Sequence, residues 1–152
     1  MAGRWRRNAL ICRDPRGFAD EHDLTCLTLR SYDCRVSLEW EQVVVDSRDP
    51  AALGRWWADA LGWVVVNESP EEFEIRPSAD LLPGLFFGQV SDAKESKNRL
   101  HLDFRPDDQQ AEVERFLRLG ARRVDIGQGS VPWVVLADPQ GNEFCVLSAR
   151  GS

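Results

Sequence analysis

From residue 38 onward, the pattern of hydrophobic and polar positions occurs twice along the chain. In each copy a short apolar strand pattern precedes a helical stripe, with apolar residues every three or four positions, and three more short strand patterns follow. The first copy predicts strands over 41–46, 63–66, 73–75 and 85–90. The second copy predicts strands over 99–105, 124–126, 133–137 and 144–147. The repeat predicts an α+β fold built from two βαβββ modules.

Each predicted helix lies between the first and second strands of its copy and has start and stop signals. Asp49 is a typical N-cap, and Pro50 suits the first helical position. Gly62 ends this helix thirteen residues after Asp49. In the second copy Asp107 or Asp108 caps the helix, and Gly120 ends it thirteen residues after Asp107.

Strand alternation predicts which side chains share the free face of each sheet, because residues i and i+2 point the same way. The apolar sets expected under the helices are Val43 with Val45, Leu100 with Leu102 and Phe104, and Phe144 with Val146. The opposite faces then carry Trp40, Gln42, His101, Asp103, Glu143 and Cys145. Polar groups able to bind a metal or move a proton therefore converge from three strands.

Composition and charge argue against several classes of function. With 43% hydrophobic and 29% charged residues, the chain can form a packed core, which excludes wholesale disorder. No apolar run approaches the roughly 20 residues of a membrane span. The formal charge of −6 argues against nucleic acid as the main partner. The apolar run after Arg7 is too short for a signal peptide, and we expect a cytoplasmic protein.

Residues 1–35 differ from the rest of the chain. They contain seven arginines and five acidic residues, a net charge of +2, whereas the remaining residues carry −8. Three of the four cysteines, Cys12, Cys26 and Cys34, lie here without the spacing of a zinc site or a disulfide framework. We expect a disordered extension, or an upstream stretch translated from a start codon assigned too early. The folded domain is expected to span 36–152.

The second copy carries two motifs that resemble the vicinal oxygen chelate superfamily. Arg99-Leu100-His101-Leu102-Asp103 opens the second module, and Asp138-Pro139-Gln140-Gly141-Asn142-Glu143-Phe144 precedes its last strand. The superfamily contains glyoxalase I, extradiol dioxygenases, and the fosfomycin- and bleomycin-resistance proteins. The resemblance covers about residues 38–149 and is closest to small bacterial glyoxalase-like domains. It implies a cupped mixed sheet with helices on the outside, a small molecule bound in the cup, and a monomer or homodimer.

The resemblance also implies a metal site. Metal-binding members take one ligand from the first strand and one from the last strand of each module. Gln42 and His101 match the first-strand positions, whereas Cys145 stands where relatives usually have a glutamate. Glu143 lies two residues earlier, and the strand over 84–89 has no carboxylate. The implied set for one divalent ion (Zn, Ni, Mn or Fe) is Gln42, His101 and Glu143. Glu143 would also be the general base of a lyase, isomerase or dioxygenase acting on adjacent oxygens.

Several alternatives stay open at this point. In a metal-free binding or antibiotic-sequestering protein, the ligand would contact Trp40, Asp103, Trp133 and Cys145. A third class is a dimerisation or regulatory module with no small-molecule role. His101 could simply be hydrogen-bonded to Asp103 or Glu143, and Glu143 could hold turn amides or pair with an arginine. Cys145 could be a small buried side chain and Gln42 a polar core contact. Asp49 and Asp138 are assigned to a helix cap and a turn.

Overall fold

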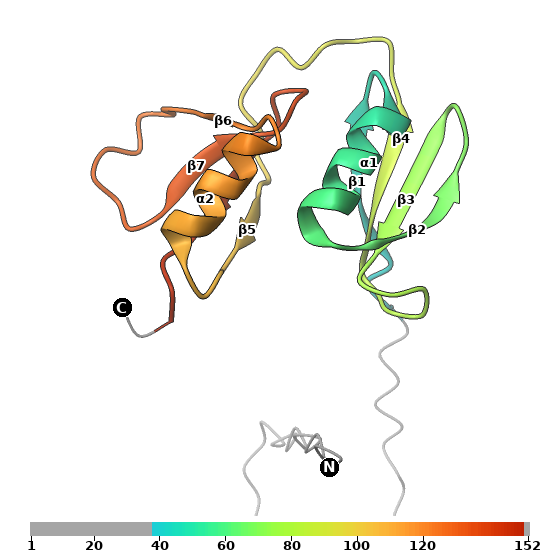
Figure 1. Ribbon diagram of the computed structural model, residues 1–152. Helices are drawn as coiled ribbons and strands as arrows, with labels where there is room; N and C mark the ends of the chain where they lie inside the picture. The colour runs from blue at the N-terminus through green and yellow to red at the C-terminus, as the bar shows by residue number, and fades with distance from the viewer. Residues whose placement is uncertain (1–37, 151–152) are drawn as a thin grey trace, which may run out of the picture. The chain divides into compact units, whose positions relative to one another are not determined.

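The computed structural model describes residues 38–150, which form two βαβββ modules joined by a long connection (Figure 1). The first module contains β1 (Gln42–Ser47), α1 (Pro50–Leu61), β2 (Val64–Glu68), β3 (Glu72–Arg76) and β4 (Gly84–Gln89). The second contains β5 (Leu102–Phe104), α2 (Gln109–Arg118), β6 (Arg122–Arg123), β7 (Val134–Ala137) and β8 (Glu143–Val146). The prediction for residues 1–35 lies outside the described residues. Neither described helix is long and apolar enough to cross a membrane.

The two modules have the same strand order, as the sequence repeat predicts. The first sheet has the order β1-β4-β3-β2 and the second β5-β8-β7-β6. In each, the first and last strands of the module pair in parallel, and the other pairs are antiparallel. The parallel pairing places Leu102 opposite Phe144 and Asp103 opposite Cys145. Residues far apart in sequence therefore meet where the edge strand β5 pairs with β8 in the second sheet.

Local capping explains where the helices begin and end. The Asp49 side chain accepts a hydrogen bond from the Ala52 amide at 2.9 Å, and Gly62 follows α1 in the left-handed conformation with φ 66°. A side chain with a Cβ would be strained there, so glycine is the natural stop. Of the two predicted caps for α2, the structure selects Asp108, which accepts from the Ala111 amide at 3.0 Å.

The two modules share one hydrophobic core. Val43, Val45, Leu102 and Phe104 all pack against it, which confirms the strand alternation that predicted them. Trp57 of α1 is only 3% exposed and contacts the ring of Phe144 with centroids 5.1 Å apart. Because one core lies against both sheets, the opposite face of each sheet is directed away from it.

Two predictions about the second sheet differ from the structure. Leu100 was expected in the apolar set, but it is 88% exposed because β5 begins only at Leu102. A strand was expected over 124–126, and the structure instead has β6 at Arg122–Arg123. Asp125 accepts a hydrogen bond from the Gly127 amide at 2.8 Å, and Gly127 has φ 79°. This local turn ends the strand before the predicted residues can continue it.

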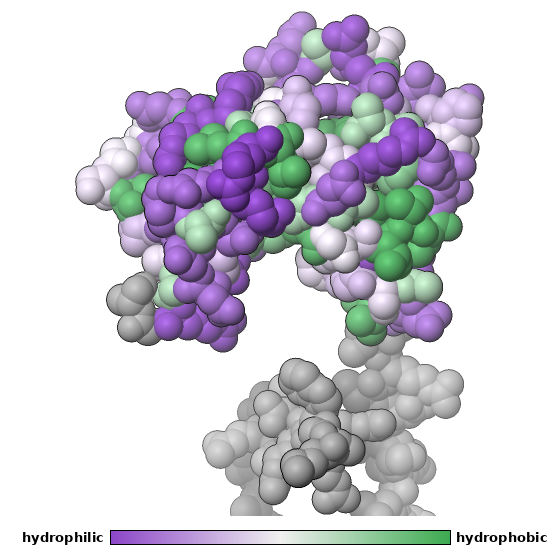
Figure 2. Space-filling model, in the orientation of Figure 1, coloured by the Kyte–Doolittle hydropathy of each residue, from purple (hydrophilic) through white to green (hydrophobic). Residues whose placement is uncertain are grey.

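The apolar strand β2 lies at the edge of the first sheet. Its valines, Val64, Val65 and Val66, are 43%, 44% and 37% exposed, and Figure 2 shows apolar surface over this strand. The register shifts between Val65 and Asn67, which interrupts the ladder. An irregularity of this kind limits the pairing of an edge strand with other chains.

Candidate functional site

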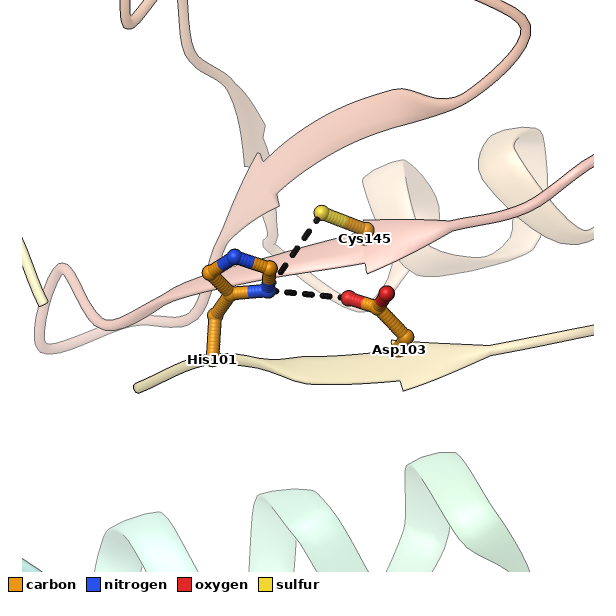
Figure 3. A group of neighbouring side chains, drawn as sticks. All are labelled: His101, Asp103 and Cys145. Atoms are coloured by element: carbon orange, nitrogen blue, oxygen red, sulfur yellow. Dashed lines mark hydrogen bonds and ion pairs between the residues drawn. The ribbon is translucent and has the colours of Figure 1, made fainter. Parts of the chain in front are cut away.

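His101, Asp103 and Cys145 form a compact group on the face of the second sheet that lies opposite the core (Figure 3). His101 directly precedes β5, Asp103 lies in β5, and Cys145 lies opposite Asp103 on β8. The Nδ1 atom of His101 is 2.9 Å from Oδ1 of Asp103 and 3.8 Å from Sγ of Cys145. One ligand atom from each residue lies within 4.8 Å of the others. The sequence predicted that these three side chains share a face, and the structure brings them together.

The group combines a buried sulfur with two accessible polar groups. Cys145 is 4% exposed, whereas the side chains of His101 and Asp103 are 38% and 45% exposed. Burial is the main cause that raises the pKa of the Cys145 thiol to about 11, and the negative charge of Asp103 raises it further. The thiol is therefore protonated at neutral pH. A ligand or metal ion can approach from the His101 and Asp103 side.

Glu143 lies on the same strand as Cys145 but has partners of its own. Its carboxylate binds the Lys94 ammonium at 3.0 Å and accepts the Asn98 backbone N–H at 3.0 Å. Burial opposes ionisation of this carboxylate, but the hydrogen bond from Asn98 and the Lys94 ammonium outweigh it, and the pKa of Glu143 is lowered. A carboxylate stabilised in this way is a weak base. Its position favours the interpretation that it anchors the 90–101 connection against β8.

The other predicted site residues, Gln42, Trp40 and Trp133, lie outside strands β5 and β8. Gln42 is half-buried on β1 of the first sheet, and no hydrogen bond links it to His101. Trp40 is 66% exposed and donates from its indole nitrogen to the Gln42 carbonyl at 3.3 Å. Trp133 is 38% exposed and directly precedes β7 of the second sheet. The predicted ligand contacts are therefore divided between two sheets.

Asp138 holds the turn before β8, as the sequence predicted. It is 1% exposed and accepts hydrogen bonds from the amides of Gln140 and Asn142, both at 2.9 Å. Its other oxygen accepts from the Asn142 side chain at 2.9 Å and from the Trp57 indole at 3.2 Å. The carboxylate therefore connects the turn of the second module to α1 of the first.

Sequence reasoning missed Lys94 and Gln140. Lys94 lies in the connection between modules, where no periodic pattern indicates which side chains point inward. The Gln140 amide nitrogen donates to the Ser47 hydroxyl at 2.8 Å, and its oxygen accepts the Arg48 backbone N–H at 3.0 Å. Such contacts depend on how the two modules pack, which local sequence does not specify.

The donors around His101 suit a divalent metal. An imidazole nitrogen, a carboxylate oxygen and a cysteine sulfur are three ligand types that Zn²⁺ accepts, and the Cys145 thiol would release its proton when a metal binds. Three protein ligands leave a position open for substrate or water. The direct contact between His101 and Asp103 shows that the same groups also satisfy one another without an ion. The donor set therefore fits a metal, with an arrangement different from the set of Gln42, His101 and Glu143.

Comparison with known proteins identifies the fold. A sequence family described as a glyoxalase-like domain matches residues 42–147. No curated protein matches the chain.

Solved structures with the same fold include a glyoxalase/bleomycin resistance protein/dioxygenase family enzyme from Burkholderia phytofirmans PsJN, with 18% identity and a TM-score of 0.58. That alignment covers 74% of this chain and 99% of the other. Protein ATC0852 from Agrobacterium tumefaciens shares 15% identity, with a TM-score of 0.57 and coverage of 75% and 99%. The fosfomycin resistance protein FosX from Mesorhizobium loti shares 16% identity, with a TM-score of 0.53 and coverage of 70% and 86%. At these identities the likeness shows the fold alone.

Proposed function

Because the chain belongs to the glyoxalase-like domain family, we propose that it is a metal-dependent enzyme acting on a small molecule with two adjacent oxygens. Its metal would be held by His101, Asp103 and Cys145. The observation that carries the proposal is the convergence of these three ligand atoms within 4.8 Å on an accessible sheet face. A divalent ion there would act as a Lewis acid and polarise a substrate oxygen.

The residues of the chain have separate tasks in this proposal. His101 and Asp103 offer their ligand atoms from the accessible side of the group, whereas Cys145 offers a sulfur from the buried side. Burial raises the pKa of the Cys145 thiol to about 11, so metal binding would have to displace its proton, and zinc affinity should rise with pH. Glu143 attaches the 90–101 connection, which ends at His101, to β8 through Lys94 and Asn98.

The first experiment is a metal titration of the full chain after treatment with a chelator. Cys12, Cys26 and Cys34 are replaced by serine, so that Cys145 is the one remaining cysteine. Co²⁺ is added as a spectroscopic probe, because a thiolate ligand gives an intense near-ultraviolet charge-transfer band. We expect this band in the triple variant and its loss in Cys145→Ser. Zn²⁺ at 100 times its dissociation constant should add about 2.7 kcal/mol to the free energy of unfolding.

The ligand variants are His101→Ala and Asp103→Asn, each measured in the same background. The matched control is His22→Ala, because His22 is the other of the two histidines in the sequence. Each ligand variant should weaken Zn²⁺ binding at least about tenfold, a loss typical of a removed ligand contact. If no tested metal binds, or if binding survives both substitutions, the metal-dependent function is wrong. Metal-free binding of a small molecule then becomes the favoured function.

A further inference from the structure

A separate pocket of about 480 Å³ lies where three segments of the chain meet. Its lining includes Asp46 and Arg48 near the end of β1, Asp92 and Lys94 of the connection, and Gln140 and Asn142 of the turn before β8. This volume lies within the roughly 300–1,000 Å³ of small-molecule sites. None of the lining residues belongs to the group of His101, Asp103 and Cys145.

Hydrogen bonds and an ion pair fix the walls of this pocket. Gln140 is bonded to the Ser47 hydroxyl and to the Arg48 amide, so the turn is attached to the end of β1. The Asn142 side chain is held by Asp138 at 2.9 Å. Lys94 is held by Glu143 at 3.0 Å. A ligand would therefore enter a site that is already formed, with little further ordering of the protein.

The charges in the lining are only partly neutralised. Lys94 is paired with Glu143, but neither the Arg48 guanidinium nor the Asp46 carboxylate has a hydrogen bond or ion pair with any residue within 38–150. The Asp92 carboxylate accepts a single hydrogen bond, from the Ser91 hydroxyl at 3.3 Å. Asp49 also lines the pocket, but its carboxylate caps α1 by accepting the Ala52 amide at 2.9 Å. The carboxylates of Asp46 and Asp92 and the Arg48 guanidinium are thus left to interact with a ligand.

We propose that this pocket binds a free amino acid with a basic side chain. The α-carboxylate pairs with the planar fork of Arg48, the geometry that guanidinium groups favour for carboxylates. The α-ammonium and the side-chain cation face Asp46 and Asp92. An amine without a carboxylate leaves Arg48 unpaired, and an acidic amino acid places further negative charge beside two carboxylates. This proposal is independent of the metal site and goes beyond the function proposed above.

The test titrates L-arginine into the metal-free, ¹⁵N-labelled full chain and follows the amides by two-dimensional NMR. We expect saturable shifts of the amides in 92–94 and 140–142, which lie in the pocket wall. Agmatine, which is arginine without its carboxylate, and L-glutamate should bind at least about tenfold more weakly, because each lacks one of the complementary charges. The amide spectra also report whether each protein is folded.

Two substitutions with matched controls decide the outcome. Arg48→Gln and Asp46→Asn should each raise the dissociation constant for L-arginine about tenfold or more. The control variants Arg118→Gln and Asp59→Asn change exposed residues of the same types on α2 and α1. They should leave the dissociation constant for L-arginine unchanged. Shifts that do not saturate, equal binding of agmatine and arginine, or no effect of the pocket variants would overturn the proposal. The metal titration reports on other residues, so failure of one proposal leaves the other standing.

Discussion

At the scale of single residues, the carboxylate of Asp138 holds the junction between the two modules together. The buried carboxylate satisfies two backbone amides, one side-chain amide and the Trp57 indole. We predict that Asp138→Ala lowers the free energy of unfolding by about 3 kcal/mol, because buried donors lose a charged acceptor. Urea denaturation followed by far-ultraviolet circular dichroism measures this loss.

The control for this prediction is Asp59→Ala, which removes an exposed carboxylate of α1 and should cost at most about 0.5 kcal/mol. Asp138→Asn keeps one acceptor oxygen, so its loss in free energy of unfolding should lie between the losses of the other two variants. A loss below about 1 kcal/mol for Asp138→Ala would mean that water replaces the carboxylate at no great cost.

Sequence reasoning about single residues succeeds where one pair of strands determines which side chains lie together. His101, Asp103 and Cys145 could be grouped in advance, because alternation assigns each to one face and the two strands are neighbours. Alternation also placed Gln42 on a free face, and the family resemblance implied that it binds a metal together with His101. Alternation gives the face of a strand within its own sheet, but not how two sheets are placed around a core, so Gln42 could not be located this way.

At the scale of elements, α1 packs on the first sheet through a glycine. A Cβ at Gly54 would lie 2.1 Å from Cδ1 of Phe73, inside the van der Waals distance of a core ring. Alanine favours a helix by about 1 kcal/mol over glycine, but the overlap forces α1 and β3 apart. We therefore predict that Gly54→Ala lowers the free energy of unfolding by about 1–3 kcal/mol, measured by urea denaturation.

A double-mutant cycle tests the cause of this loss. Phe73→Leu removes the ring that the new methyl group would meet, so the two substitutions together should cost less than the sum of their separate effects. Additive losses would show that overlap with the Phe73 ring does not cause the loss in stability. The exposed variant Ala52→Gly in the same helix calibrates the propensity difference, at about 1 kcal/mol.

Element boundaries were predictable wherever a local signal determines them. Asp49, Pro50 and Gly62 define α1 through capping and backbone conformation alone, and the structure confirms them. The strand expected over 124–126 fails for a local reason as well, since Asp125 forms a turn with Gly127 that competes with the strand. Apolar residues at alternating positions do not reveal such a turn.

At the scale of the whole molecule, the sequence repeat predicts two similar modules but not the contacts between them. The Trp56 indole donates to the Leu119 carbonyl at 2.8 Å, and the Arg115 guanidinium donates to the Ala60 carbonyl at 2.8 Å. These bonds join α1 to the end of α2 and α2 to the end of α1. Tryptophans on one helix are equally compatible with packing inside a single module, so the common core is visible only in the structure.

This common core has a thermodynamic consequence that can be measured. Because rings of α1 contact Phe116 and Phe144 of the second module, neither module can expose its core without exposing that of the other. We predict that residues 38–150 unfold in one cooperative transition. In native-state hydrogen exchange, the slowest amides of β4 and β8 should then report the same free energy of opening. Gln140→Ala, which detaches the β8 turn from Ser47, should lower both values together. Two separate transitions, or a loss confined to β8, would show that each module is stable by itself.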